Sequence, residues 1–194
     1  LNEPVWDGGG LRSTKRIDAS IATIHELLSR KNKVIVMSHH SADNQSLSPV
    51  ATYLKKTFTN LEFIQSTDMN TVTEFVKSNT EVELIMLENT RLFQDGADEK
   101  NDDVFAKELS SLADYFIFDA FSVAHREHAS VVGVSKYLPH CLGPVARKEL
   151  EMLSKVLDKN NPPFVILGGA KLSSKLPLLE TFVKNGSRVF LGGA

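Results

Sequence analysis

The sequence predicts an α/β fold, a parallel sheet sandwiched by helices in a Rossmann-like lobe. Short runs rich in β-branched and aromatic residues alternate with longer stretches whose apolar residues recur every three or four positions. Several of the short runs are apolar on both faces, which is typical of parallel strands that helices cover on each side. With 42% hydrophobic and 24% charged residues, the 194-residue chain has enough apolar material for a sizeable core.

The predicted helices and strands alternate from one end of the chain to the other. Ile21, Ile24 and Leu27 share one face of the first helix, and each strand is a short run dominated by Val, Ile, Leu, Met or Phe. The polar stretch 94–103, with five acidic residues, is predicted to be a solvated loop. In chain order the elements are helix 19–30, strand 33–37, helix 48–58, strand 61–64, helix 70–77, strand 84–87, helix 102–112, strand 115–119, helix 145–157, strand 164–167, helix 175–184 and strand 188–191.

A polar segment with two prolines, residues 158–163, is the best candidate for a linker between domains. We therefore expect an N-terminal lobe over 1–157 and a linker over 158–163. Residues 164–194 would then form a strand–helix–strand unit, too small to fold alone, that opens a second lobe. Because the chain starts without Met and stops directly after an apolar run, we also expect it to be a piece of a longer protein.

Charge and cysteine content exclude several classes of protein. The formal net charge is −2 with six histidines, so no global basic field is available for binding nucleic acid. The single cysteine, Cys141, cannot form an internal disulfide. No signal peptide is visible in this sequence, and it contains no run of about 18 apolar residues to cross a membrane. These features predict a cytoplasmic protein without nucleic-acid or membrane partners.

Basic and imidazole side chains follow three of the predicted strands. His39 comes after the first strand, Arg91 after the third, and His125 and Arg126 after the fourth, while Arg16 precedes the first helix. Ligands of open parallel sheets bind where strands end, and an arginine fork binds phosphate or carboxylate through paired hydrogen bonds. The pattern favours a small phosphorylated acid as ligand. The alternative is that these are solvated surface residues.

A second candidate binding feature is a Gly-Gly turn between a strand and a helix. Gly168 and Gly169 would let backbone N–H groups approach a phosphate, and Lys171 and Lys175 lie four apart, on one face of a first helical turn. A plain strand–helix turn is the alternative, since neither GxxxxGK[ST] nor GxGxxG is present. There is no Cys pair and no HExxH, so we expect no metal site in the chain.

Eight short segments occur in a recognisable order. They are Leu1-Asn2-Glu3-Pro4, Arg16-Ile17-Asp18-Ala19-Ser20-Ile21, Met37-Ser38-His39, Ser46-Leu47-Ser48-Pro49-Val50-Ala51, Leu87-Glu88-Asn89-Thr90-Arg91, Asp119-Ala120-Phe121 with Ala124-His125-Arg126, Gly143-Pro144 and Leu167-Gly168-Gly169-Ala170-Lys171. Their order and spacing are similar to those of the phosphoglycerate kinases, and the chain resembles that family over nearly its whole length.

The resemblance implies a two-lobed, monomeric glycolytic enzyme. Such an enzyme transfers a phosphoryl group reversibly between 1,3-bisphosphoglycerate and ADP, giving 3-phosphoglycerate and ATP. Mg accompanies the nucleotide, and its ligands are not in this chain. The implied catalytic residues are Arg16 and Lys171; the implied 3-phosphoglycerate ligands are Asn2, Arg16, His39, Arg91, His125 and Arg126; the implied nucleotide ligands are Gly168, Gly169, Lys171 and Lys175. This chain alone is not expected to catalyse transfer.

The chain departs from the family pattern in part of the implied substrate site. In the motif S-H-L-G-R-P, Ala42 replaces an arginine that binds substrate, and in D-A-F-G-T-A-H-R the Gly and Thr are Ser122 and Val123. Ser174 stands where an Asp is common. These changes favour an alternative function, that of a degenerate relative without catalysis that acts as a binding or interaction module.

Overall fold

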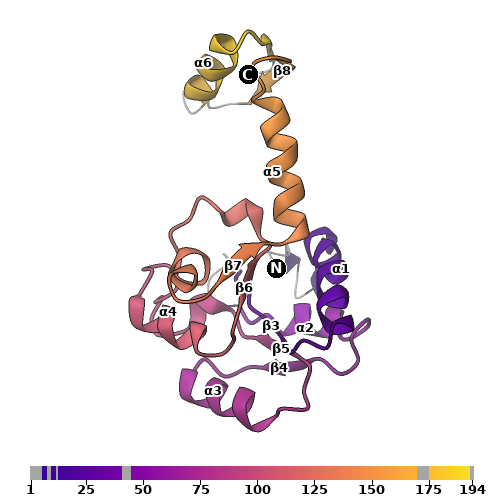
Figure 1. Ribbon diagram of the computed structural model, residues 1–194, viewed down its shortest axis with the longest axis vertical. Coiled ribbons are helices and arrows are strands. Elements are labelled where there is room, and N and C mark those ends of the chain that lie inside the picture. The colour runs from indigo at the N-terminus through magenta and orange to yellow at the C-terminus, as the bar shows by residue number, and fades with distance from the viewer. Residues whose placement is uncertain (1–5, 8–9, 12, 41–44, 170–174, 193–194) are drawn as a thin grey trace. The chain divides into compact units, whose positions relative to one another are not determined.

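The computed structural model describes residues 6–7, 10–11, 13–40, 45–169 and 175–192 of the chain (Figure 1). The chain divides into two compact units, residues 1–146 and 147–194, and each is described by itself. The division falls inside helix α5 (Pro144–Val156), upstream of the linker expected at 158–163. The domain boundaries drawn from the sequence therefore stay a prediction.

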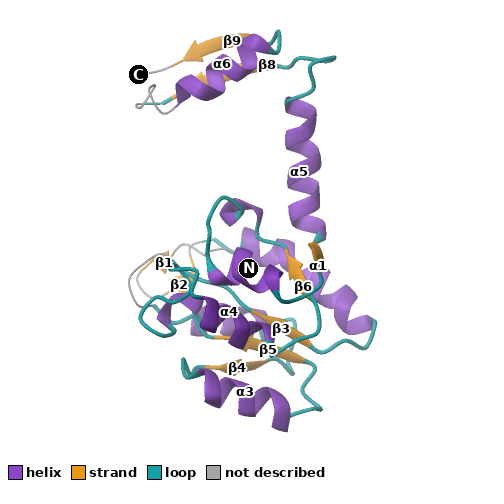
Figure 2. Cartoon of the chain, turned by 60° about the vertical axis from the view of Figure 1, so that its left-hand side comes forward, coloured by secondary structure: helices purple, strands orange, loops and turns teal. Residues whose placement is uncertain are grey.

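The first unit is built on parallel strands, as expected from their apolar composition. Strands β3 (Val34–Val36), β5 (Leu84–Leu87) and β4 (Glu62–Ile64) form a parallel sheet in the order β3-β5-β4. All four residues of the central strand, β5, are buried. A separate parallel pair joins β6 (Phe116–Phe118) to β7 (His140–Leu142). The α/β class with parallel strands and helices is thus confirmed (Figure 2).

Two apolar clusters cover the two faces of the three-stranded sheet. Leu84 and Met86 of β5 belong to the cluster that includes Ile17 and Val50, whereas Ile85 and Leu87 belong to the other. This alternation follows from the pleat, which turns successive side chains to opposite faces. The helices involved are α1 (Lys15–Ser29) and α2 (Ser48–Leu54) with the first cluster and α3 (Met69–Ser78) and α4 (Asp103–Ser110) with the second.

Aspartates fix the starts of two of these helices. The Asp68 carboxylate accepts hydrogen bonds from the backbone N–H of Asn70 at 3.3 Å and of Thr71 at 3.1 Å, before α3. Asp102 caps α4 in the same way through the backbone N–H of Phe105, at 2.9 Å. Capping places the first turn of each helix, because it satisfies N–H groups that have no partner within the helix.

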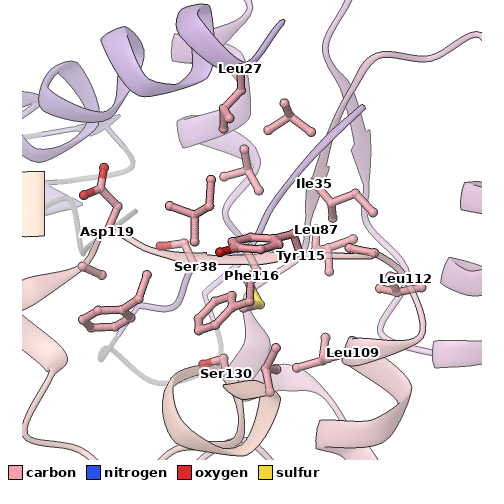
Figure 3. Close-up of a pocket in the computed structure, with 18 of the residues that line it drawn as sticks. Leu27, Ile35, Ser38, Leu87, Leu109, Leu112, Tyr115, Phe116, Asp119 and Ser130 are labelled. Carbon is pink, nitrogen blue, oxygen red and sulfur yellow. The ribbon is translucent and has the colours of Figure 1, made fainter. Parts of the chain in front are cut away.

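A cavity of about 630 Å³ lies between β3 and β6, lined by residues of both strands and by α1 (Figure 3). Among the described strands, β3 pairs with β5 and β6 pairs with β7, so the facing edges of β3 and β6 are not joined by strand pairing. Most of the lining is apolar, with Leu27, Ile35 and Phe116 labelled in Figure 3. The predicted strands therefore form, but they do not make one continuous sheet.

The second unit contains the strand–helix–strand arrangement expected for residues 164–194. Strands β8 (Phe164–Gly168) and β9 (Arg188–Gly192) are parallel, and α6 (Leu176–Lys184) connects them in sequence. Phe182 of α6 is buried, but Phe164 and Ile166 of β8 are 67% and 68% exposed. One face of the two-stranded sheet is thus apolar and exposed to solvent.

All the predicted strands and helices of the described residues are present, with ends shifted by a few residues. Helix α1 begins four residues earlier than expected, and α2 ends four residues earlier, after Leu54. The sequence pattern missed the shortest elements: the antiparallel pair β1 (Trp6–Asp7) and β2 (Gly10–Leu11), β7, the 3₁₀ helices η1 (Thr90–Leu92), η2 (Phe121–Val123) and η4 (Val134–Lys136), and the π-helical turn η3 (Ala129–Gly133). No described helix is long and apolar enough to span a membrane.

Candidate functional site

Two buried side chains at the end of β5 hold the loops that follow β3 and β5. The carboxylate of Glu88 accepts hydrogen bonds from Ser46 Oγ at 2.6 Å and from the backbone N–H groups of Leu47 and Asn89 at 2.7 Å. The Asn89 side chain accepts from the backbone N–H of His40, at 3.3 Å, and donates to the Gln45 carbonyl, at 2.9 Å. These bonds fix both loops at the carboxyl end of the sheet.

Arg91 lies in the 3₁₀ turn η1, directly after this anchor. Asn89 Oδ1 accepts a hydrogen bond from the Arg91 backbone N–H at 3.1 Å, which sets the start of the turn. The guanidinium pairs with Glu99 at 3.3 Å, and only 13% of the Arg91 side chain is exposed. Its Nε is buried without a hydrogen-bond partner in the described part of the chain. Arg91 is therefore a largely buried cation that an ion pair holds in place, and its Nε–H group is available to donate a hydrogen bond.

Asp98 joins the loop after β5 to the segment after β6. Its carboxylate accepts hydrogen bonds from Thr90 Oγ1 at 2.5 Å, from the Ser130 backbone N–H at 2.8 Å and from Ser130 Oγ at 3.1 Å. Its backbone carbonyl accepts from the Ala129 N–H at 2.8 Å. Asp98 is completely buried. The prediction that 94–103 is a solvated loop is wrong at this position, because the hydrogen bonds compensate the cost of burying the charge.

Two histidines lie beside Asp98. His39, after β3, and His128, before η3, are 7% and 5% exposed, and their ring centroids are 5.7 Å apart. Burial, reinforced by the Arg91 charge, lowers the pKa of His39 to about 4. Burial also lowers the pKa of His128. Both rings are therefore neutral at pH 7, and Nδ1 of His128 is buried with no hydrogen-bond partner among the described residues.

The other predicted residues of the first unit are more exposed. Arg16 lies in the first turn of α1, and His125 and Arg126 lie in the loop after η2. The charges of Arg91 and Arg126 both act on His128, so the two arginines supply positive charge to one region, in which His39 is a neutral imidazole. No contact that the structure describes links Arg16 or His125 to this group.

In the second unit, Gly168, Gly169 and Lys175 come together at the end of β8. Gly169 has a φ of 117°, in a region that favours glycine, and the Nζ of Lys175 donates a hydrogen bond to the Gly168 carbonyl. Lys175 directly precedes α6. The Lys175 ammonium group therefore lies beside the backbone of this turn, and a side chain at position 169 would collide with it.

Four residues that the sequence analysis singled out lie outside the described residues: Asn2, Ala42, Lys171 and Ser174. Two buried members of the site, Asp98 and His128, were not predicted. Asp98 lies in a stretch of acidic residues, and no sequence feature distinguishes it from its neighbours. His128 follows two exposed basic residues, so its burial was not expected. The only signal in the sequence was the position of His128, close behind a predicted strand.

A family model described as phosphoglycerate kinase matches residues 1–194. The chain belongs to the phosphoglycerate kinase family. It is 39% identical over 204 residues to a phosphoglycerate kinase of Finegoldia magna, and 37% identical over 202 residues to one of Pseudothermotoga lettingae. All of this chain is covered in both cases, but only 51% and 50% of those proteins. The chain thus spans about half the length of the curated relatives it matches.

Solved phosphoglycerate kinases have the same fold. The structure from Coxiella burnetii matches 99% of this chain and 50% of its own, with a TM-score of 0.83 and 29% identity. The structure from Pyrococcus horikoshii matches 100% of this chain and 51% of its own, with a TM-score of 0.82 and 26% identity. Membership of the phosphoglycerate kinase family, expected from the eight ordered segments, is confirmed.

The lowered pKa of His39 predicts that the free energy of unfolding of the chain falls in acid. Protonation favours the unfolded state, where the pKa is about 6.5. Above pH 6.5 the neutral His39 side chain makes its full contribution to the free energy of unfolding, about 3 kcal/mol. This contribution is lost progressively as the pH falls toward 4. Urea unfolding between pH 7 and pH 4 in the presence of a chelator measures this loss.

Two variants isolate the contribution of His39 from that of other acid-titrating groups. His39→Gln should show a shallower decline in unfolding free energy, because no imidazole remains to be protonated. His140→Gln, which changes an exposed histidine, should decline like the unchanged protein. Equal declines in all three proteins would contradict the assignment to His39.

Proposed function

We propose that this chain provides the 3-phosphoglycerate-binding lobe of a phosphoglycerate kinase. The observation that supports it best is the region to which Arg91 and Arg126 supply positive charge and His39 a neutral imidazole, from loops that follow three different strands. Ligands of parallel sheets bind at this end of the strands. A phosphate or carboxylate would give the buried Arg91 Nε the hydrogen-bond acceptor that it lacks.

The proposed reaction is reversible phosphoryl transfer between 1,3-bisphosphoglycerate and ADP, giving 3-phosphoglycerate and ATP. The acceptor carboxylate is already a nucleophile, so the protein need only position the reactants and neutralise charge. On the family pattern Arg16 and Lys171 would neutralise the phosphoryl group in transit, while Asn2 and His125 would contact the 3-phosphoglycerate. Arg16 is exposed, as a residue that meets a ligand must be before the ligand binds.

The nucleotide would lie against the second unit, with Mg bound to its phosphates as part of the substrate. The open backbone at Gly168 and Gly169 and the ammonium group of Lys175 suit a phosphate group. On the family pattern Lys171 would add a second ammonium group. The exposed apolar face at Phe164 and Ile166 is typical of a lobe that needs further layers, which supports residues 164–194 as its beginning.

The remaining features of the proposal come from the sequence and the family. We propose lobes over 1–157 and 164–194 joined by a linker over 158–163, in a monomeric cytoplasmic protein without nucleic-acid or membrane partners. Acidic side chains balance the basic cluster, so the net charge of the chain is −2. This balance supports the proposal that the protein has no nucleic-acid partner. Transfer activity would require the complete two-lobed protein.

Calorimetric titration with 3-phosphoglycerate tests the substrate-binding proposal. The unchanged chain should bind the ligand, and Arg91→Ala should bind it about 10- to 100-fold more weakly, because a charged hydrogen bond is worth about 1.5–3 kcal/mol. Arg30→Ala is the matched control, because Arg30 is an exposed arginine paired with Glu26 at 2.7 Å. Absence of binding by the folded, unchanged chain, or equal loss in both variants, would overturn the proposal.

A second candidate function is that of a non-catalytic binding or interaction module of this family. The replacements at Ala42, Ser122 and Val123 favour it, and Val123 is buried in η2, where the family motif has a threonine hydroxyl. Turnover of the complete protein separates the two functions. A kinase has a kcat of about 1–100 per second, whereas the module would bind ligand without transferring phosphoryl groups.

A further inference from the structure

A buried cluster of metal-ligating groups lies at the carboxyl ends of the strands. His39, Asp98 and His128 each offer one ligand atom, and these three atoms all lie within 4.8 Å of one another. All three side chains are buried, between 0% and 7% exposed. We propose that they bind one divalent transition-metal ion, and that the ion is Zn²⁺. The inference does not rest on phosphoryl transfer, although the cluster shares His39 with the proposed 3-phosphoglycerate site.

The composition of the cluster selects the ion. Two imidazoles and one carboxylate are the ligand set of many zinc sites with an open fourth position, whereas Mg²⁺ and Ca²⁺ prefer oxygen ligands. Zinc bonds of about 2.0–2.1 Å in a tetrahedron place ligand atoms about 3.4 Å apart. The atoms must therefore draw together by up to about 1.4 Å from the 4.8 Å limit, which rotation of the two rings can supply.

An unpartnered buried nitrogen supports the site independently of this geometry. His128 Nδ1 has no hydrogen-bond partner among the described residues, although a buried polar atom without one is costly. A metal ion would give that nitrogen a partner. Both rings have lowered pKa values, so they are in the neutral form that binds metal at pH 7.

Asp98 is already fixed in the manner of a metal ligand. Its carboxylate has about four acceptor positions, and hydrogen bonds from Thr90 and Ser130 fill three of them. One position is left for an ion, and the surrounding donors hold the carboxylate in place. The cavity beside β3 offers a way in, since His39 and Ser130 both line it.

Two nearby charges oppose a cation. Arg91 acts electrostatically on both His39 and His128, and Arg126 acts on His128. Its guanidinium is paired with Glu99 at 3.3 Å, which compensates part of its charge. The two negative charges of Asp98 and Glu99 balance the two positive charges of Arg91 and Arg126, so the ligand set, and not a net negative charge, has to attract the ion.

Titration of the full chain with Co²⁺ and Zn²⁺ tests the proposal. All proteins carry Cys141→Ser, because Cys141 is an exposed thiol next to His140 and would bind these ions weakly by itself. We expect one Co²⁺ per chain, with the visible absorption of a tetrahedral site, and displacement of Co²⁺ by one equivalent of Zn²⁺. Absence of binding at micromolar to 0.1 mM free ion would overturn the proposal.

Variants locate the ion. His128→Gln and His39→Gln should each lower the affinity at least about 100-fold, since loss of even an outer-shell partner costs 10- to 100-fold. Asp98→Asn should do the same while keeping an amide oxygen for the Ser130 N–H. His140→Gln, an exposed histidine, is the control and should bind like the parent. Circular dichroism checks that each variant is folded, and unchanged affinity in the folded His128 and His39 variants would overturn the assignment.

Discussion

Replacing Asp98 with alanine is expected to lower the free energy of unfolding by about 3–5 kcal/mol. The carboxylate is completely buried and accepts hydrogen bonds from Thr90 Oγ1, at 2.5 Å, and from both the N–H and the hydroxyl of Ser130. Alanine would leave these buried donors without an acceptor, and each such loss costs about 1–3 kcal/mol. Urea unfolding at pH 7 in the presence of a chelator measures the difference.

Two further variants separate the hydrogen bonds from other effects of the substitution. Asp98→Asn keeps one acceptor oxygen, so its loss should be about half as large. Asp114→Ala, which changes an exposed aspartate, should remain within about 0.5 kcal/mol of the unchanged protein. If Asp98→Ala were as stable as Asp114→Ala, Asp98 would not anchor the two loops.

Replacing Gly143 with alanine is expected to cost about 3 kcal/mol or more. Gly143 is buried between β7 and α5, and a Cβ added there would lie 2.7 Å from Asp119 Cβ, closer still to the Asp119 carboxyl group. Asp119 cannot move aside freely, since it accepts hydrogen bonds from Thr23 Oγ1 at 3.0 Å and from the Ala146 N–H at 2.9 Å. Thermal or urea unfolding of Gly143→Ala measures the cost.

A double-mutant cycle identifies the clash as the cause. Asp119→Ala removes the carboxyl group, so the combined variant should be less destabilised than the sum of the single variants, by at least about 1 kcal/mol. Gly96→Asn is the control: no atom lies within 4 Å of an added Cβ, and asparagine tolerates the φ of 81° there. Simple additivity of Gly143→Ala and Asp119→Ala would contradict the explanation.

The basic residues His39 and Arg91 of the candidate site could be predicted from the sequence, but the buried Asp98 could not. His39 and Arg91 could be found because each lies within four residues after an apolar run, and the carboxyl ends of parallel strands meet at one edge. Asp98 could not, because one aspartate in an acidic stretch has no pattern that separates it from solvated neighbours. Its role arises from contacts with Thr90 and with Ser130, 32 residues away.

The sequence by itself determined the elements and their class, because the period of apolar residues is a local property of the chain. It predicted the parallel strands β3, β5 and β8 within a residue or so at each end. Only the tertiary structure decided how these strands join. β3 and β6 line a cavity instead of pairing, since strand pairing depends on hydrogen bonds between distant segments that local periodicity does not encode. For the same reason the burial of Asp98, His39 and His128 beside one another was decided only by the fold.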